Sequence, residues 1–171
     1  MERYSRQIVL DKIGKEGQEK LLKKRAIVVG LGGTGGLISQ LLVRAGIGKL
    51  YISDKDYVSL SNIHRQTLFR ESDVGKLKVE AALDYLKSLN SDVEIVPIYE
   101  GISSSNIEEY VKDVDIVMDG TDNFITRYII NDACVKNNKP WIYSAAISTY
   151  GSVMAIIPGK TACLRCMIRD P

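Results

Sequence analysis

The sequence lacks the long apolar runs and the charge excess that mark several protein classes. No window approaches the roughly 20 consecutive apolar residues of a membrane-spanning helix. The amino-terminal residues also lack the apolar core of a secretory signal. The 23 lysines and arginines nearly balance the 21 aspartates and glutamates, which leaves a formal net charge of +2. We therefore expect a cytoplasmic protein whose partners include neither nucleic acid nor a membrane surface.

Cysteine is also scarce, with 3 residues in a chain of 171. An odd count in a cytosolic protein does not suggest a disulfide framework. Cys163 and Cys166 form a CxxC pair, which points to metal or redox chemistry. Tetrahedral zinc needs four such ligands, so the pair supplies half of a zinc site. Because Cys134 is expected to be a buried thiol on a helix, we predict no complete zinc site within one copy of this sequence.

The hydrophobic pattern favours one α/β domain. A chain of 171 residues with 45% hydrophobic content can bury a single core, and strand-like runs alternate with helical ones. We expect strands at 26–29, 49–53, 93–99, 114–118, 141–146 and 153–157, and helices at 14–24, 33–45, 106–112 and 126–137, with another beginning near 78. This alternation predicts a doubly wound, mostly parallel, Rossmann-like sheet with helices on both faces.

Three further segments complete the predicted organisation. Residues 1–24 form an amino-terminal helical segment, and the long polar stretch 54–75 suggests a functional loop. In the helix expected at 33–45, the apolar residues Leu37, Ile38, Leu41 and Leu42 recur at helical spacing. Residues 158–171 have no periodicity, so we expect an irregular, loose tail that carries the CxxC pair.

A glycine-rich motif indicates a nucleotide site. Gly30, Gly32 and Gly35 fit G-x-G-x-x-G directly after a predicted strand and at the start of a predicted helix. Glycines permit a close backbone approach, and the helix start offers unpaired N–H groups to phosphate. Asp54 ends the next strand, where such folds place the acceptor for ribose hydroxyls. The pair does not choose between a mononucleotide and a dinucleotide, and a tight turn without a ligand is the structural alternative.

Polar residues after the other strands favour a phosphate-rich ligand. Arg65 offers a planar donor fork, and Lys78 begins a helix just before its apolar stripe, where it can point away from the core. Asp122 follows an apolar strand and could hold a magnesium ion. Taken singly, each has a plain alternative, as a solvated charge or, for Asp122, as the N-cap of the following helix.

Together the motifs resemble the adenylating family of MoeB, ThiF and HesA, relatives of the ubiquitin-activating enzymes. The similarity covers essentially all 171 residues and implies one ATP-binding adenylation domain over 1–171. The motifs, in order, are RYSRQ at 3–7, GxGGxG at 30–35, the strand that ends at Asp54, SNxxRQ at 61–66, VGxxK at 74–78, TDN at 121–123 and CxxC at 163–166.

The resemblance implies roles for individual residues. ATP would be held at the glycine loop, with magnesium at Asp122. The ATP-binding set implied is Gly30, Gly32, Gly33 and Gly35 in the loop, Asp54 at the ribose, Asn62, Arg65 and Lys78 around the phosphates, and Asn123 beside the metal ligand. Arg6 resembles an arginine that reaches the triphosphate of the neighbouring subunit in a homodimer.

The reaction implied by the resemblance is adenylation of a ubiquitin-like sulfur-carrier protein. The carrier's C-terminal glycine carboxylate would attack the α-phosphorus of ATP, giving an acyl-adenylate and pyrophosphate. Family members continue beyond the first CxxC, through a second CxxC and carrier-binding strands, which this sequence lacks. Two alternatives stay open: an NAD-dependent Rossmann oxidoreductase, and a truncated nucleotide-binding module without full activity.

Overall fold

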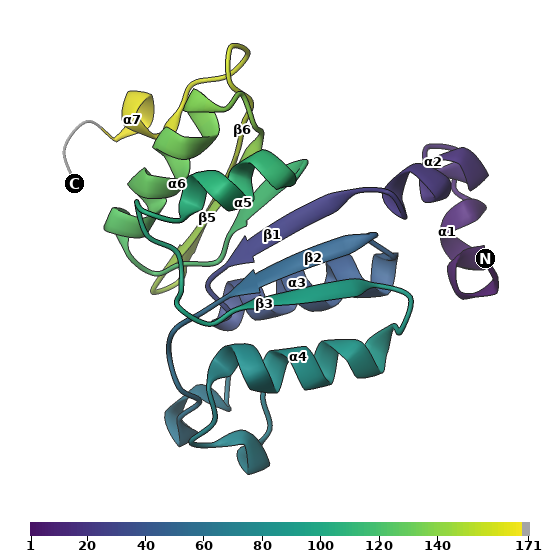
Figure 1. Cartoon of the computed structure of the whole chain (residues 1–171), viewed down its shortest axis with the longest axis horizontal. Helices are drawn as coiled ribbons and strands as arrows, with labels where there is room; N and C mark the ends of the chain where they lie inside the picture. Colours follow the sequence, from purple (N-terminus) through teal and green to yellow (C-terminus); the bar gives the residue numbers. More distant parts are fainter. Residues whose placement is uncertain (169–171) are drawn as a thin grey trace.

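A six-stranded sheet forms the centre of the computed structural model, which describes residues 1–168 (Figure 1). The strand order is β3-β2-β1-β4-β5-β6. The strands are β1 (Arg25–Val29), β2 (Lys49–Ser53), β3 (Glu94–Ile98), β4 (Ile116–Asp119), β5 (Trp141–Ile147) and β6 (Tyr150–Ile156). Strands β1 to β5 run parallel, and β6 pairs antiparallel with β5. The predicted fold class, a doubly wound and mostly parallel sheet, is confirmed.

Helices cover both faces of this sheet. The helices are α1 (Ser5–Ile8), α2 (Gly14–Leu21), α3 (Gly33–Ala45), α4 (Lys78–Leu89), α5 (Ile107–Asp113), α6 (Phe124–Lys136) and α7 (Leu164–Met167), with 3₁₀ turns η1 (Glu2–Tyr4), η2 (Leu60–Asn62) and η3 (Glu71–Asp73). Figure 1 shows α3 and α4 on one face and α5 and α6 on the other. Within the described residues, no helix has both the length and the apolar character needed to span a membrane.

Alternation along β1 explains the two cores. Ala26 and Val28 belong to the cluster under α3 and α4, whereas Ile27 and Val29 belong to the cluster under α5 and α6. Successive strand residues point to opposite faces, so an unbroken apolar run is what a strand covered on both sides requires.

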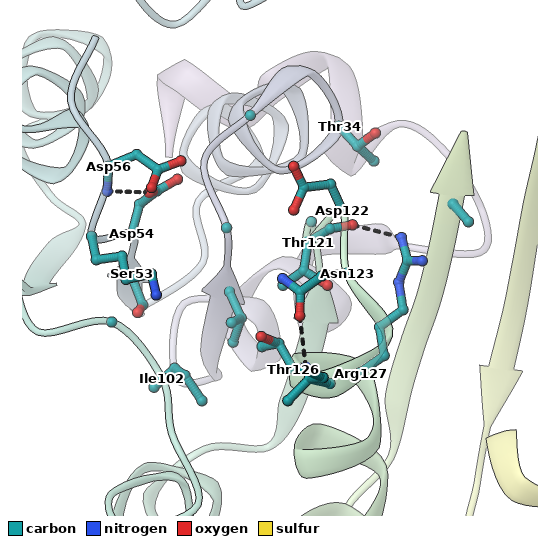
Figure 2. Close-up of a pocket in the computed structure, with 18 of the residues that line it drawn as sticks. Thr34, Ser53, Asp54, Asp56, Ile102, Thr121, Asp122, Asn123, Thr126 and Arg127 are labelled. Carbon is teal, nitrogen blue, oxygen red and sulfur yellow. Dashed lines mark hydrogen bonds between the residues drawn. The ribbon is translucent and has the colours of Figure 1, made fainter. Parts of the chain in front are cut away.

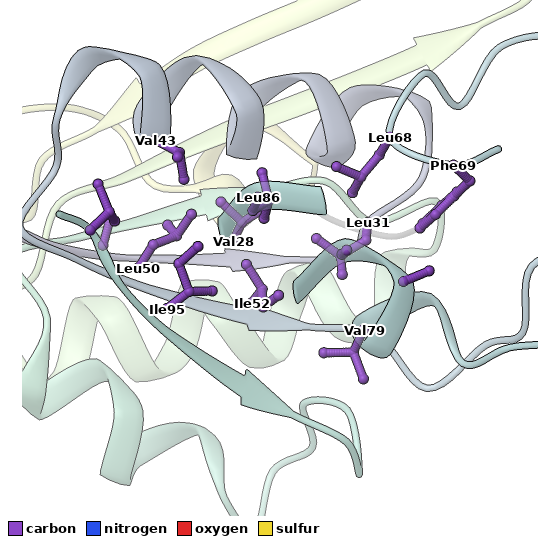
Figure 3. Close-up of a cluster of buried hydrophobic side chains, with 14 of the residues drawn as sticks. Val28, Leu31, Val43, Leu50, Ile52, Leu68, Phe69, Val79, Leu86 and Ile95 are labelled. Atoms are coloured by element: carbon purple, nitrogen blue, oxygen red, sulfur yellow. The ribbon is translucent and has the colours of Figure 1, made fainter. Parts of the chain in front are cut away.

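The predicted functional loop at 54–75 is anchored in the first of these cores. Leu68 and Phe69 are buried beside the glycine-loop residue Leu31 and the α4 residue Val79 (Figure 3). Two 3₁₀ turns, η2 and η3, lie within this loop. The loop is therefore a packed part of the domain that is fixed next to the start of α3.

Helix α3 meets the sheet through small, polar and aliphatic residues, and two of its leucines face outward. Leu37 and Leu41 are exposed, while Gly36, Ser39 and Val43 are buried. A Cβ atom at Gly36 would lie 3.2 Å from the Cβ of Leu68, so the helix packs too closely for a large residue there. Of the four apolar positions that predicted this helix, Ile38 and Leu42 pack against the core, whereas Leu37 and Leu41 face outward.

The tail also differs from the prediction, because its last described part is a short docked helix. Leu164 of α7 has none of its surface exposed, and its backbone N–H donates to Asn131 Oδ1 at 2.9 Å. Arg165 pairs with Asp132 through an Nη2 to Oδ2 distance of 2.6 Å. A four-residue helix has no period that a sequence pattern can show, and these tertiary contacts fix it. Residues 169–171 of the predicted tail lie outside the described residues.

Replacing Leu164 by alanine tests whether the tail is docked. The substitution should lower the free energy of unfolding by about 2–5 kcal/mol, because it removes a fully buried side chain and leaves a cavity. Thermal or urea unfolding measures the change. Met167→Ala is the control, since Met167 is exposed and its truncation should cost no more than about 0.5 kcal/mol. Equal stability of both variants would mean that α7 is not packed.

Candidate functional site

A cavity of about 770 Å³ opens at the carboxyl ends of the parallel strands. It is lined by the turns that follow β1, β2, β3 and β4 and by the end of β5 (Figure 2). The strand order reverses between the neighbours β1 and β4, so their following turns leave toward opposite faces of the sheet. Open α/β sheets bind ligands at such a switch point.

The glycine loop forms the floor of this cavity. Gly30 has φ +84°, and a Cβ there would lie 2.7 Å from the carbonyl oxygen of Gly120. Gly32 and Gly33 line the cavity, and Gly32 is the N-cap of α3 without a side-chain capping bond. The first turn of α3 therefore presents N–H groups that an anion can accept.

Gly35 has a different place from the other three glycines of the predicted set. It is buried behind the loop and is absent from the cavity lining. A Cβ at this position would lie 1.8 Å from the carbonyl oxygen of Gly30. Gly35 therefore lets α3 approach β1, which is a packing requirement of the motif and not a contact with the ligand.

Asp54 connects β2 to the glycine loop. Its Oδ2 accepts from the backbone N–H of Leu31 at 2.8 Å, and its Oδ1 accepts from that of Asp56 at 2.9 Å. Burial raises the pKa of the Asp54 carboxyl, against the opposing effect of these two donors. Because the Asp54 pKa is higher in the folded state, its protonated carboxyl adds to the free energy of unfolding at low pH. This contribution is lost as pH rises from the ordinary pKa through the raised one. The carboxylate still lines the cavity and retains free lone pairs.

Two cations reach the cavity from the adjoining loop and helix. Arg65 is exposed, and its Nη1 donates to the carbonyl oxygen of Ser61 at 2.9 Å. Lys78, at the start of α4, is only 7% exposed, and its Nζ lies 3.1 Å from Asp56 Oδ2. Both residues line the cavity. Lys78 is thus buried in the protein and not solvated on an outer face, yet its ammonium group lies at the cavity wall.

Asn62 lies outside the cavity lining. Its Oδ1 accepts from the backbone N–H of Ser59 at 3.0 Å, which completes a capping box around η2. The amide oxygen of Asn62 is therefore used by the loop itself. In this structure its part is to shape the turn that precedes Arg65.

Asp122 and Asn123 have distinct roles although they are neighbours. Both are exposed and line the cavity. Asn123 is the N-cap of α6, since its Oδ1 accepts from the N–H of Thr126 at 2.9 Å (Figure 2). Among residues 1–168, no hydrogen bond or ion pair engages the carboxylate of Asp122. The capping explanation considered for Asp122 thus belongs to Asn123.

The free carboxylate of Asp122 fits a magnesium ion. Magnesium prefers oxygen ligands and is usually held by one or two carboxylates together with substrate phosphates. No group of three or more His, Cys, Asp or Glu side chains gathers within the described residues to form a metal cage of its own. A single carboxylate on a cavity that also presents two cations and a helix start is therefore an arrangement that would suit magnesium bound together with a nucleotide.

Arg6 and the cysteines lie away from the cavity. Arg6 is exposed and lies outside the cavity lining, on α1, which is next to the beginning of β1 in Figure 1. The sulfur atoms of Cys163 and Cys166 are 3.5 Å apart, and both are free thiols. Cys134 is fully buried on α6, and burial raises the pKa of its thiol to about 12. Within one chain, Arg6 and the CxxC pair thus lie outside the lining of the cavity.

The sequence analysis assigned no role to three residues of the cavity lining, Ser53, Gln66 and Arg127, or to the buried Asp119 that pairs with Arg127. Ser53 Oγ and Gln66 Oε1 are buried polar atoms without a hydrogen-bond partner among residues 1–168, which is rare unless a ligand or water supplies one. Arg127 falls on the buried stripe of α6 with Ile130 and Cys134. A charged residue on an otherwise apolar stripe was the signal that could have identified it.

Comparisons with known proteins agree with this geometry. The sequence pattern of the ThiF family matches residues 4–171. This chain belongs to the ThiF family. The predicted resemblance is therefore confirmed.

Individual relatives of this ThiF-family chain are adenylyltransferases by name. It is 44% identical to the sulfur carrier protein ThiS adenylyltransferase of Bacillus subtilis (strain 168), over 97% of this chain and 50% of that protein. It is 38% identical to the enzyme of the same name from Escherichia coli (strain K12), over 98% of this chain and 67% of that protein. The chain thus spans about half to two thirds of these curated relatives.

A solved structure shares the fold. The E. coli MccB structure with AMPCPP and selenomethionine MccA superposes with a TM-score of 0.86 at 30% identity. The match covers 99% of this chain and 52% of that one. The family, the fold and the cavity at the switch point therefore agree.

Proposed function

We propose that this chain is the nucleotide-binding part of an ATP-dependent adenylyltransferase that activates the C-terminal glycine carboxylate of a ubiquitin-like sulfur-carrier protein. The observation that carries the proposal is the convergence of Arg65, Lys78 and Asp122 on the cavity around the glycine loop. Two cations and a free carboxylate suit a magnesium triphosphate. The names of the relatives, and the AMPCPP and MccA in the E. coli MccB structure, support the same class of reaction.

The reaction needs positioned charge and no nucleophilic side chain. The carrier's carboxylate oxygen attacks the α-phosphorus, the bond from that phosphorus to the bridging oxygen breaks, and pyrophosphate leaves with the bond's electron pair. In this proposal the N–H groups at the start of α3 hold phosphate oxygens, and Asp54 accepts from a ribose hydroxyl. Arg65 and Lys78 balance charge on the triphosphate as it shifts to the leaving group.

Magnesium would be held by Asp122 together with phosphate oxygens of the nucleotide. When bound, the ion would neutralise phosphate charge and orient the leaving pyrophosphate. The exposed Asp122 carboxylate can reach such an ion without giving up a hydrogen bond within the described part of the chain. Docking of the carrier is proposed for the whole protein, since relatives are longer than this chain.

Replacing Lys78 by methionine tests the triphosphate assignment. Magnesium-ATP binding should weaken about 10- to 100-fold, the effect of losing one charge-assisted contact in a buried site. Calorimetric titration with ATP and with NAD measures it, and the unmodified chain should bind ATP and not NAD. Lys76→Met is the matched control, because the exposed Lys76 pairs with Asp73 and lies outside the cavity lining. Saturable NAD binding without ATP binding would favour an oxidoreductase instead.

We also propose a homodimer in which Arg6 of one chain completes the cavity of its partner. Arg6 is exposed and lies outside the cavity lining of its own chain, which is compatible with this arrangement. Mixing Arg6→Ala chains with Lys78→Ala chains should restore carrier-dependent pyrophosphate exchange, with about a quarter of the sites intact after random pairing of equal amounts. If two folded, dimeric and inactive variants show no recovery when mixed, each site is built within one chain.

A further inference from the structure

The turn that carries Asp122 is held by a buried ion pair. Asp119, the last residue of β4, has none of its surface exposed, and Arg127 of α6 is only 5% exposed. Arg127 Nε lies 3.1 Å from Asp119 Oδ2. The rings of Phe124 and Tyr143 lie 5.4 and 5.3 Å from the guanidinium carbon, so the group is enclosed by aromatic faces.

The remaining contacts of this pair converge on the residue just before Asp122. Arg127 Nη2 donates to the carbonyl oxygen of Thr121 at 2.6 Å (Figure 2). Asp119 Oδ1 accepts from both the backbone N–H of Thr121, at 2.9 Å, and its hydroxyl, at 2.6 Å. The backbone N–H, the carbonyl oxygen and the hydroxyl of Thr121 are therefore all held by one ion pair.

The same pair also attaches the turn to the neighbouring strand. Arg127 Nη2 donates to the carbonyl oxygen of Ser144 on β5 at 3.2 Å. The hydroxyl of Ser144 donates to the carbonyl oxygen of Asp119. On the far side of Asp122, Asn123 is fixed as the N-cap of α6. The residues on both sides of Asp122 are thus held by hydrogen bonds, while its own carboxylate forms none within residues 1–168.

Stability alone does not explain a buried pair of this kind. Desolvating two charges is expensive, and well-packed apolar residues of similar volume are often equally stable or more so. Here the pair's hydrogen bonds all go to the turn between β4 and α6 and to the adjoining strand. An apolar replacement could fill the space, but it could not hold the carbonyl of Thr121.

We propose that Arg127, through Asp119 and Thr121, is a positioning residue for the Asp122 carboxylate. The ion pair fixes the turn before nucleotide arrives, so the carboxylate meets the magnesium-triphosphate without first ordering the backbone. This inference rests on the proposed function, because it assigns Asp122 to the metal. Arg127 itself acts through the turn and is not a catalytic residue.

The test compares ATP binding in magnesium with ATP binding in EDTA, by calorimetry, for each variant. In the unmodified chain, magnesium should tighten ATP binding, and Asp122→Asn should remove most of that gain. We call the ratio of the ATP affinity in magnesium to that in EDTA the magnesium gain. Arg127→Gln should reduce this magnesium gain about tenfold, the effect of one misplaced charged contact, while the ATP affinity in EDTA changes much less. Partial unfolding would lower the number of binding sites and leave the ratio of the two affinities unchanged, which separates positioning from a merely structural role.

Two further variants make the outcome decisive. Thr121→Val removes the hydroxyl bond to Asp119 with little change in shape, so it should lower the magnesium gain even if Arg127→Gln does not fold. Arg165→Gln is the matched control, because Arg165 also pairs with an α6 aspartate and lies 4.6 Å from the Tyr128 ring, yet lies outside the cavity lining.

Each result has a definite meaning. An unchanged magnesium gain in folded Arg127→Gln, or in Thr121→Val when the first variant does not fold, would overturn the positioning role and leave the proposed function standing. ATP binding that magnesium does not strengthen in the unmodified chain would overturn the assignment of Asp122 and this inference with it. Absence of ATP binding would overturn the proposed function itself.

Discussion

Two backbone turns touch at the carboxyl ends of β1 and β4, where no side chain fits between them. A Cβ at Gly30 would lie 2.7 Å from the carbonyl oxygen of Gly120, and a Cβ at Gly120 would lie 2.5 Å from that of Gly30. The Gly120 N–H donates to the carbonyl oxygen of Val29, and the Gly30 N–H donates to the carbonyl oxygen of Ser53. This contact brings the turns after β1, β2 and β4 together, so the start of α3 and Asp122 face one cavity.

Charge around the cavity follows from that arrangement. The α3 dipole and the two cations Arg65 and Lys78 favour a polyanion, whereas Asp54 and Asp122 favour hydroxyls and a divalent cation. The glycine loop and Asp54 would serve a dinucleotide equally well, whereas the two cations Arg65 and Lys78 favour the more highly charged triphosphate. The ThiF-family match is consistent with the choice of ATP that this charge distribution favours.

The sheet and the glycine loop could be predicted because their signals are local. Strand runs, the glycine spacing and Asp54 all depend on neighbours in sequence. Asn62 caps η2 through a local contact with Ser59, whereas the exposure of Leu37 and Leu41 on α3 and the docking of α7 depend on tertiary contacts that no period shows. Arg127 was missed for the same reason: its partners Asp119, Thr121 and Ser144 come from different elements. Gly35 matched the motif, but its place behind the loop follows only from the packing of α3 on β1.

Exchange of labelled pyrophosphate into ATP measures the central claim, that this cavity supports activation of a carboxylate by ATP. The whole protein would be incubated with ATP, magnesium, labelled pyrophosphate and purified ubiquitin-like sulfur-carrier proteins, each with and without its C-terminal glycine. Our account predicts exchange with an intact carrier and none when the terminal glycine is removed. Exchange that ignores that glycine, or no exchange with any carrier from a protein that binds NAD tightly, would contradict it.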